Sequence, residues 1–297
     1  DLGGTWYNNR YPGARFDSES YTYGYSFSQE LLDEWDWKEM FSAQPENLEY
    51  LNFVADKFDL RQHMQFNCRV QSAIFDEDRQ VWKVTVSDGR ELTSRFVVLA
   101  LGLLSQPTMP RMEGVEDFTG RSWHTYSWSH EHVDLSDQRV AVIGTGATAI
   151  QVIGEIADKV GELTVFQRRP NWVAPLNNSE ISAEQMTEIR DRYDEIFETC
   201  ARTPGGFEHE PDRRGFYEVT REERYELWDQ LYDAHGFSIW LRNFREIVTD
   251  EETNAELSEY VAERIRGPVH DPVVAEKLVP KDHGFGVQRV PMETGYL

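Results

Sequence analysis

Residues 142–151, VIGTGATAIQ, contain the turn that decides the fold of this chain. Gly144 and Gly146 follow an apolar run, and Ala149 takes the third position of a Gly-x-Gly-x-x-Gly/Ala spacing. The first glycine permits a tight turn out of a strand, the second lets a pyrophosphate approach the backbone, and the small third residue lets helix and strand pack closely. The pattern predicts a Rossmann-type βαβ unit with a strand at 139–144, a helix at about 147–160 and a strand at 162–167.

The start of that predicted helix is suited to phosphate. Free N–H groups and the positive end of the helix dipole meet there. We therefore expect dinucleotide contacts from Gly144, Thr145, Gly146, Ala147 and Gln151.

The end of the second strand indicates which dinucleotide is bound. An NAD site usually carries Asp or Glu there to hold the ribose hydroxyls, whereas this chain reads QRRP at 167–170. Arg168 and Arg169 offer forked donors suited to a 2′-phosphate. The alternative is that both arginines only solvate a surface loop. In a chain with a net charge of −23, paired arginines at this position favour NADP.

The composition limits the other partners. The chain has 297 residues, 39% apolar and 13% aromatic, which is enough for two domains with cores of their own. Its 30 Lys and Arg against 53 Asp and Glu disfavour nucleic acid and anionic membranes. No membrane-length apolar run or signal pattern is present, so we expect a soluble cytoplasmic protein. Cys68 and Cys200 lack partner spacing, which predicts free thiols and no metal site.

The rest of the chain predicts further elements. Residues 46–58 have helical spacing, 81–86 alternate like a strand that turns at 87–89, and the apolar run 96–102, FVVLALG, predicts a buried parallel strand. The stretch 105–114 holds two prolines and marks a crossing between domains. Helices are predicted at 183–201, 221–235 and 253–266, with capping boxes formed by Ser182 with Gln185 and by Thr220 with Glu223.

Two segments look like parts of a second dinucleotide fold. The opening LGGTW at 2–6 would follow its glycine-rich turn, and the run at 96–102 would close its sheet. The turn itself would lie upstream of Asp1. We therefore expect the chain to be a piece of a longer protein or to carry a degenerate domain.

The aromatic stretch at 118–130, FTGRSWHTYSWSH, points to one family. It resembles the signature Phe-x-Gly-x-x-x-His-x-x-x-Trp of the flavin-dependent Baeyer–Villiger monooxygenases at Phe118, Gly120, His124 and Trp128. These enzymes use FAD, NADPH and O₂ to insert oxygen beside a ketone carbonyl. The related flavin monooxygenases that oxidise nitrogen and sulfur usually lack the tryptophan. Ser129 stands where the signature commonly continues with proline.

Three other motifs extend the resemblance over most of the chain. Residues 3–20 resemble the FAD-contacting stretch, with Asn8 and Phe16 where Trp and Cys are more usual. Residues 100–110 resemble the segment that leads into the linker, with Leu101 in place of Thr. Residues 271–296 resemble the segment that carries the active-site arginine, with Gln288 where the family often has Lys. The helical region 180–266 matches only loosely.

The resemblance implies an α/β fold with two Rossmann-like dinucleotide-binding domains, of which the FAD domain is incomplete. The expected parts are a partial FAD-binding domain at 1–110, a linker with the signature at 111–138, and an NADP-binding domain at 139–297 with a helical insertion at about 180–270. Cofactor contacts are implied for Gly3, Gly4, Trp6, Arg15, Asp17, Tyr23 and Gly102 toward FAD and for Gln288 toward NADP. His124 would organise the hinge between the domains, the alternative being a packed interdomain loop.

Arg289 and Asp17 are the residues that the resemblance makes catalytic. The reaction develops an anion beside the apolar flavin, and a desolvated anion is costly without a partner. A guanidinium stays charged at any working pH and can donate to two oxygens, which suits Arg289, and a carboxylate at Asp17 would orient it. Without the resemblance, Arg289 reads as a surface arginine on a glycine-rich loop and Asp17 as a turn residue.

Three functions stay open at this stage. The first is an NADPH- and FAD-dependent monooxygenase that converts a ketone and O₂ to an ester or lactone. The second is a flavin monooxygenase that oxidises nitrogen or sulfur. The third is a non-catalytic NADP-binding fragment, and the chain by itself is expected to hold FAD poorly and to be inactive.

Overall fold

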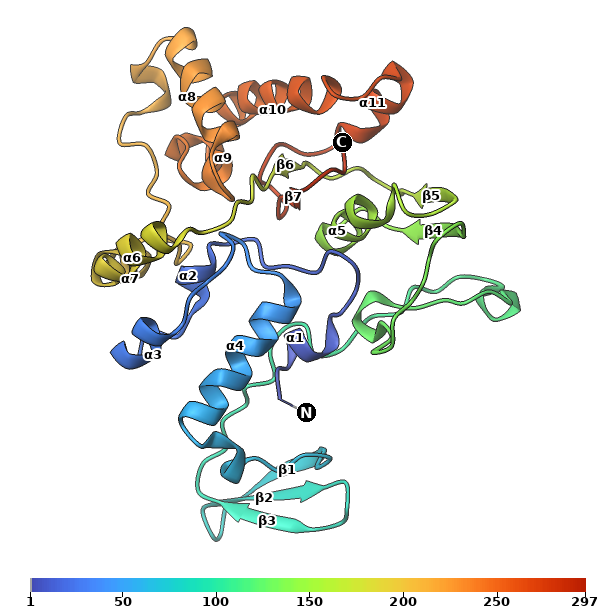
Figure 1. The fold of residues 1–297 in the computed structure, drawn as a ribbon, viewed down its shortest axis with the longest axis vertical. Coiled ribbons are helices and arrows are strands. Elements are labelled where there is room, and N and C mark those ends of the chain that lie inside the picture. Colours follow the sequence, from blue (N-terminus) through green and yellow to red (C-terminus); the bar gives the residue numbers. More distant parts are fainter. Residues whose placement is uncertain (1) are drawn as a thin grey trace. The chain divides into compact units, whose positions relative to one another are not determined.

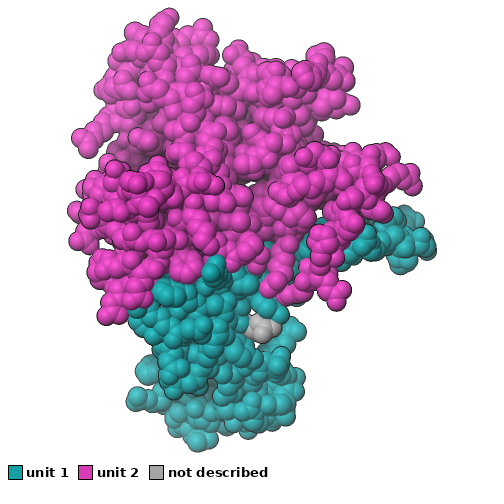
Figure 2. All heavy atoms as spheres, viewed as in Figure 1, with its two compact units in different colours: residues 1–9, 47–128 teal, residues 10–46, 129–297 magenta. Residues whose placement is uncertain are grey.

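The computed structural model describes residues 2–297. The chain forms two compact units: unit 1 comprises residues 1–9 and 47–128, and unit 2 comprises residues 10–46 and 129–297 (Figure 2). These units reflect packing and do not show which cofactor a segment holds. The functional boundaries expected near 110 and 138 therefore stay a prediction.

Unit 1 combines short helices with an antiparallel sheet (Figure 1). Its sheet has the order β1-β2-β3, and Gly89, with φ of +86°, makes the turn into β3 possible. The predicted strand at 81–86 and the predicted helix at 46–58 are confirmed as β2 and α4. The elements are α1 (Thr5–Asn8), α4 (Gln44–Lys57), η1 (Leu60–His63), β1 (Val70–Asp76), β2 (Val81–Val86), β3 (Glu91–Ser94), η2 (Val115–Asp117) and η3 (Thr125–Ser127), with residues 44–46 of α4 counted in unit 2.

The prediction of a buried parallel strand at 96–102 is wrong. The segment is irregular, and its apolar side chains are exposed, Val98 to 88% and Leu99 to 72%. A strand that is apolar on both faces requires neighbouring strands and covering layers. Within residues 2–297, no strand pairs with this segment, and the hydrogen bonds that Phe96 makes are local ones to Ser94.

Unit 2 contains the predicted βαβ unit. The strands β4 (Arg139–Ile143) and β5 (Glu162–Phe166) pair in parallel from Arg139 opposite Glu162 to Ile143 opposite Phe166. The crossover helix α5 (Ala147–Ile156) buries Ile150, Val152, Ile153 and Ile156. It ends four residues earlier than the 147–160 prediction, because Val160 already bridges to Ser136 and Gly161 donates to the Gln138 carbonyl at 2.9 Å.

The helical region of unit 2 follows the capping signals closely. Ser182 and Gln185 form a complete capping box, and Thr220 and Glu223 form another. The helix predicted at 183–201 is interrupted at Arg192, whose φ of −110° and ψ of 5° end one helix and begin the next. The elements are α6 (Ala183–Asp191), α7 (Tyr193–Arg202), η4 (Phe216–Glu218), α8 (Arg221–Asp233), α9 (Ser238–Leu241), η5 (Arg245–Val248), α10 (Glu251–Arg266) and α11 (Pro272–Leu278).

A hydrophobic core lies mainly in this helical region and reaches the βαβ unit through Ile150. Aromatic rings dominate it: Trp228, Phe216 and Phe244 are almost fully buried, and Phe216 meets Phe244 edge to face at 5.7 Å. Two short parallel strands, β6 (Ala174–Pro175) and β7 (Met292–Glu293), cross this core. The segment before α4 adds α2 (Ser20–Tyr23) and α3 (Gln29–Glu34) to unit 2.

Cys68 and Cys200 are free thiols, as the spacing predicts. No helix among residues 2–297 is both long and apolar enough to cross a membrane. The same residues contain no cluster of three or more His, Cys, Asp or Glu side chains arranged to hold a metal ion.

Candidate functional site

The glycine-rich turn leaves open space at the start of α5. Gly144 has φ of +107°, a conformation that side chains rarely adopt, and Gly146 is the N-cap of the helix. A Cβ added at either glycine would meet no atom within 4 Å. The first-turn N–H groups of a helix have no acceptor within the helix. The turn therefore presents backbone donors to a space that a phosphate group can enter.

The two arginines follow β5 at the same edge of the sheet as this turn, because β4 and β5 are parallel. The buried Thr145 hydroxyl donates to the Arg169 carbonyl at 3.3 Å, which ties the turn to the arginine segment. Arg169 is exposed and pairs with Asp282 at 3.2 Å. Arg168 is exposed and joins no ion pair of residues 2–297. Its guanidinium is available to an anionic ligand.

The segment that follows these arginines is fastened to the segment that carries Arg289. Asn171 donates its side-chain amide to the Arg289 carbonyl at 3.0 Å, and the Trp172 indole donates to the His283 carbonyl at 3.0 Å. The pairing of β6 with β7 continues the contact. The backbone at Arg289 is therefore fixed relative to the end of β5, whereas the neighbouring Gln288 side chain is exposed.

Helix α5 supports both segments that carry the expected catalytic residues. A Cβ at Gly13 would lie 2.6 Å from the Gln151 carbonyl, and one at Gly154 would lie 2.4 Å from the Thr294 carbonyl. Only glycine allows these close approaches. Gln151 adds a second link, because its amide donates to the Arg15 carbonyl at 3.1 Å and accepts from the Tyr11 hydroxyl at 2.9 Å. Both polar groups of the Gln151 side chain thus bind other residues of the protein. The expected contact of Gln151 with the cofactor stays a prediction.

Arg289 and Asp17, 272 residues apart, lie in contact. Arg289 Nη2 donates to Asp17 Oδ1 at 2.7 Å and to Oδ2 at 2.5 Å. The Asp17 side chain is only 8% exposed, whereas that of Arg289 is 51% exposed. Asp17 therefore anchors Nη2 of the guanidinium, while the Arg289 side chain stays 51% exposed. Their catalytic roles stay a prediction.

Burial affects the ionisation of Asp17. Desolvation raises the pKa of the Asp17 carboxyl, and the charge and hydrogen bonds of Arg289 only partly oppose that rise. Burial likewise raises the pKa of Tyr11, whose hydroxyl is held by Gln151. Arg289 thus favours the charged form of the Asp17 carboxyl, against the effect of burial.

Arg15 and Tyr23 lie in the same segment but are held by protein contacts. Arg15 Nη1 pairs with Glu39 at 2.8 Å and donates to the Phe41 carbonyl at 2.9 Å. The Tyr23 ring packs on Phe16, with centroids 3.9 Å apart. These contacts show that Arg15 has a structural function, and an additional contact with FAD stays a prediction for both residues.

Unit 1 carries the remaining residues expected to contact FAD. Gly3 has φ of +115°, a conformation that side chains rarely adopt, so glycine is favoured at this position. Gly4 is the N-cap of α1, and a Cβ there would meet no atom within 4 Å. Trp6 is buried, while Gly102 is exposed with φ of +70°.

The aromatic signature forms a compact turn in unit 1. His124 Nδ1 accepts the Tyr126 backbone N–H at 3.2 Å and caps η3. Trp128 packs against Trp123 with ring centroids 5.3 Å apart, and the Phe118 ring lies so close to Gly120 that a Cβ would approach it to 2.5 Å. His124 thus has a local structural function, and the hinge role of the signature stays a prediction.

A buried pair that the sequence did not predict lies next to this site. Glu19 and His209 lie 3.0 Å apart, with side chains 5% and 8% exposed. Nothing in the spacing of these residues links them. The one available signal was the polar run DSES at 17–20, which is unusual for a segment that is buried throughout.

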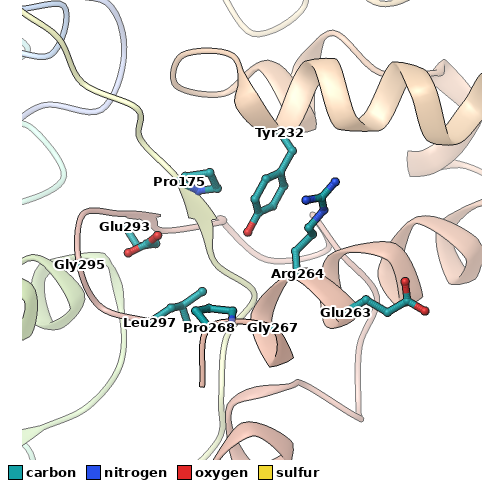
Figure 3. Close-up of a pocket in the computed structure, with 9 residues that line it drawn as sticks. All are labelled: Pro175, Tyr232, Glu263, Arg264, Gly267, Pro268, Glu293, Gly295 and Leu297. Carbon is teal, nitrogen blue, oxygen red and sulfur yellow. The ribbon is translucent and has the colours of Figure 1, made fainter. Parts of the chain in front are cut away.

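A separate hollow of about 460 Å³ lies between α8, α10 and β7 (Figure 3). None of the expected site residues lines it. Its lining consists of Pro175, Tyr232, Glu263, Arg264, Gly267, Pro268, Glu293, Gly295 and Leu297. The Arg264 guanidinium lies 5.4 Å from the centre of the Tyr232 ring and pairs with Asp229, so this cation already has partners within the protein.

Comparison with known proteins agrees with this arrangement. The family model of the pyridine nucleotide-disulphide oxidoreductases matches residues 15–209. A 2-oxo-Δ3-4,5,5-trimethylcyclopentenylacetyl-CoA monooxygenase of Pseudomonas putida is 46% identical over the whole chain. A Baeyer–Villiger monooxygenase of Pseudooceanicola batsensis is 40% identical over 95% of the chain. The chain spans 55% of the length of the first relative and 52% of the second.

Solved structures show the same fold. A crystal structure of OTEMO in complex with FAD and NADP matches with a TM-score of 0.96 and 46% identity, over all of this chain and 57% of that chain. The α/β fold with Rossmann-type domains is therefore confirmed. The chain belongs to the pyridine nucleotide-disulphide oxidoreductase family and, within it, to the group that contains the Baeyer–Villiger monooxygenases.

Proposed function

We propose that the protein carrying this chain is an NADPH- and FAD-dependent Baeyer–Villiger monooxygenase. In the overall reaction, a ketone, O₂, NADPH and a proton give an ester or lactone, NADP⁺ and water. The observation that carries the proposal is the Arg289–Asp17 contact, in which a buried carboxylate holds a half-exposed guanidinium. Such a preorganised cation suits a reaction in which negative charge develops on oxygen.

The residues around α5 fit NADP. The open space at Gly144 and Gly146 suits a pyrophosphate at the helix N-terminus, and Arg168 and Arg169 suit the 2′-phosphate. Arg169 would exchange or share its contact with Asp282 when the phosphate is present. Toward FAD, the open position at Gly4 is compatible with close approach of a ligand to the backbone. When bound, NADPH supplies the hydride and FAD supplies the chemistry that activates O₂.

The residues of this chain would position the reacting groups and stabilise the negative charge that develops on oxygen. They would not take up protons themselves. Arg289 would donate its open N–H groups to oxygen atoms that gain negative charge, because a guanidinium keeps its charge at any working pH. Asp17 would fix one edge of the guanidinium, so that little reorganisation is needed when charge develops. The link from Asn171 to the Arg289 carbonyl would hold the loop in register with the NADP-binding segment.

The test uses the full-length protein, loaded with FAD and supplied with NADPH, ¹⁸O₂ and a panel of small cyclic and open-chain ketones. We expect an ester or lactone that carries one ¹⁸O atom. Arg289→Ala should lower the rate of ester formation by about 100-fold or more, as for the loss of an oxyanion donor. Arg214→Ala, which removes an exposed arginine paired with Asp212, is the matched control and should leave the rate unchanged.

Other outcomes point to the other functions. Oxidation of methyl phenyl sulfide without any ester from the ketones would indicate a flavin monooxygenase for sulfur and nitrogen. A full-length protein without flavin absorption would indicate a non-catalytic NADP-binding protein.

The proposal places the enzyme in the reducing cytoplasm, where the free thiols of Cys68 and Cys200 persist.

A further inference from the structure

The segment that carries Asp17 is a buried polar run. Asp17, Ser18, Glu19 and Ser20 all have exposures of 5% or less. Ser20 is satisfied by the backbone, since its hydroxyl lies 2.8 Å from the Glu39 carbonyl and accepts the Ser42 N–H at 2.8 Å. Glu19 is different because it places a second carboxyl group in the interior, two residues from Asp17. A buried carboxylate requires a partner.

That partner is His209, in the loop between α7 and η4. His209 Nε2 lies 3.0 Å from Glu19 Oε1, at ion-pair distance although not in good hydrogen-bond geometry. Glu19 Oε2 is enclosed and has no hydrogen-bond partner among residues 2–297. The preceding residue of the loop, Glu208, accepts the Tyr21 hydroxyl at 3.0 Å. Two successive residues of this loop, Glu208 and His209, thus contact the chain just after Asp17, at Tyr21 and Glu19.

Glu19 and Asp17 are two buried carboxyl groups, and the negative charge of Glu19 disfavours the ionised form of Asp17. Burial is the main cause of the raised pKa of Asp17, and the negative charge of Glu19 adds to it. Burial and the charge of Glu208 raise the pKa values of Tyr21 and Cys200, and the charge of Glu19 contributes further to both. The titratable and charged groups that face this pair of carboxyls are Tyr11, Tyr21, Arg192, Cys200, Glu208, His209 and Arg289.

We propose that Glu19 and His209 are positioning residues for the Asp17–Arg289 pair, with His209 offsetting the Glu19 charge so that Asp17 stays ionised and holds Arg289. The loop between α7 and η4 is then part of the active-site support. The importance of this pair for catalysis rests on the proposed function, but its effect on Asp17 does not.

The inference predicts opposite effects from the two partners. In His209→Gln the imidazole is lost, the Glu19 charge is left without its offset, and Asp17 should take up its proton at higher pH. In Glu19→Gln the negative charge is removed, and Asp17 should release its proton at lower pH than in the parent. The two displacements should therefore be opposite in sign. In the double variant, Asp17 should titrate between the two single variants.

The experiment follows the Asp17 carboxyl carbon by NMR across a pH series, in the FAD-loaded full-length protein with ¹³C-labelled aspartate. Asp17→Asn identifies the resonance. Tyr21→Phe is the matched control, because it breaks the other contact of the same loop without changing a charge beside Asp17. In this variant, the titration of the Asp17 carboxyl should coincide with that in the parent. Circular dichroism establishes that each variant is folded.

Displacements in the same direction, or none, in the two single variants would overturn the inference and leave a purely structural pair. If His209→Gln does not fold, the direction of the Glu19→Gln displacement alone decides. In activity assays, the acidic limb of the kcat profile should move to higher pH in His209→Gln and to lower pH in Glu19→Gln. If no ketone is oxidised, the proposed function fails, while the carboxyl titration still tests the inference.

Discussion

Arg289→Ala removes the cationic partner of a buried carboxylate, and we expect it to destabilise the protein in a pH-dependent way. Breaking a fully buried pair by removing one partner destabilises by about 3–5 kcal/mol. Here Asp17 is buried, but the Arg289 side chain is 51% exposed, so solvent already weakens the pair. We therefore expect a loss of roughly 1–3 kcal/mol in the free energy of unfolding at pH 8.

The sign of the pH dependence follows from the pKa of Asp17. Burial raises that pKa in the folded protein, so an ionised Asp17 opposes folding as the pH rises through the folded value. Arg289 limits this rise, and its removal should increase it. The loss in free energy of unfolding caused by Arg289→Ala should thus be largest at pH 8. It should be smallest under acidic conditions, where Asp17 is protonated in both the parent and the variant.

The assay is urea unfolding of the full-length protein at pH 5 and pH 8, followed by circular dichroism, for the parent, Arg289→Ala, Asp17→Asn and the double variant. In Asp17→Asn, Arg289→Ala should have little further effect, because the buried charge is gone. A loss that is equal at both pH values, together with additive effects in the double variant, would refute the view that Arg289 favours the charged form of Asp17.

Three further predictions concern the supporting structure. Arg168→Ala should raise the KM for NADPH by about 10-fold or more, the equivalent of one charge-assisted hydrogen bond, and leave the KM for NADH unchanged; equal changes for both would remove the 2′-phosphate assignment. Gly146→Val should fold normally, since its Cβ meets no atom within 4 Å, but lose NADP binding in calorimetry, whereas Gly154→Val should unfold at lower temperature because its Cβ would lie 2.4 Å from the Thr294 carbonyl. Thr220→Ala should lower stability by about 1 kcal/mol through the lost cap and leave ketone oxidation unaffected, as measured by denaturation and by product yield.

Local elements could be predicted from the sequence because their signals are local. The strand, glycine-rich turn, helix and strand between 139 and 166 follow from apolar spacing and from the glycines, and both capping boxes lie where serine or threonine precedes a glutamine or glutamate by three residues. The partial misses at 147–160 and 183–201 are boundary errors. In the first, the chain leaves the helix early to pair with residue 136, and in the second, a single turn at Arg192 divides one predicted helix.

The run at 96–102 shows the limit of such reasoning. Its apolar residues are typical of a buried strand, but a strand forms only where a neighbouring strand shares its backbone hydrogen bonds. The residues of the run do not show whether such a neighbour is present. In residues 2–297 none pairs with it, and the segment stays irregular.

The sequence by itself determined the nucleotide turn, the charge at the end of its second strand and the motifs that resemble one enzyme family. The tertiary structure alone decided the contacts between distant segments: Gln151 turned to Tyr11 and Arg15, and Glu19 met His209. It also showed that Asp17 is buried while Arg289 is half exposed, an asymmetry that the motif does not state. Spacing encodes structure over a few residues, whereas burial and long-range electrostatics depend on which segments the fold brings together.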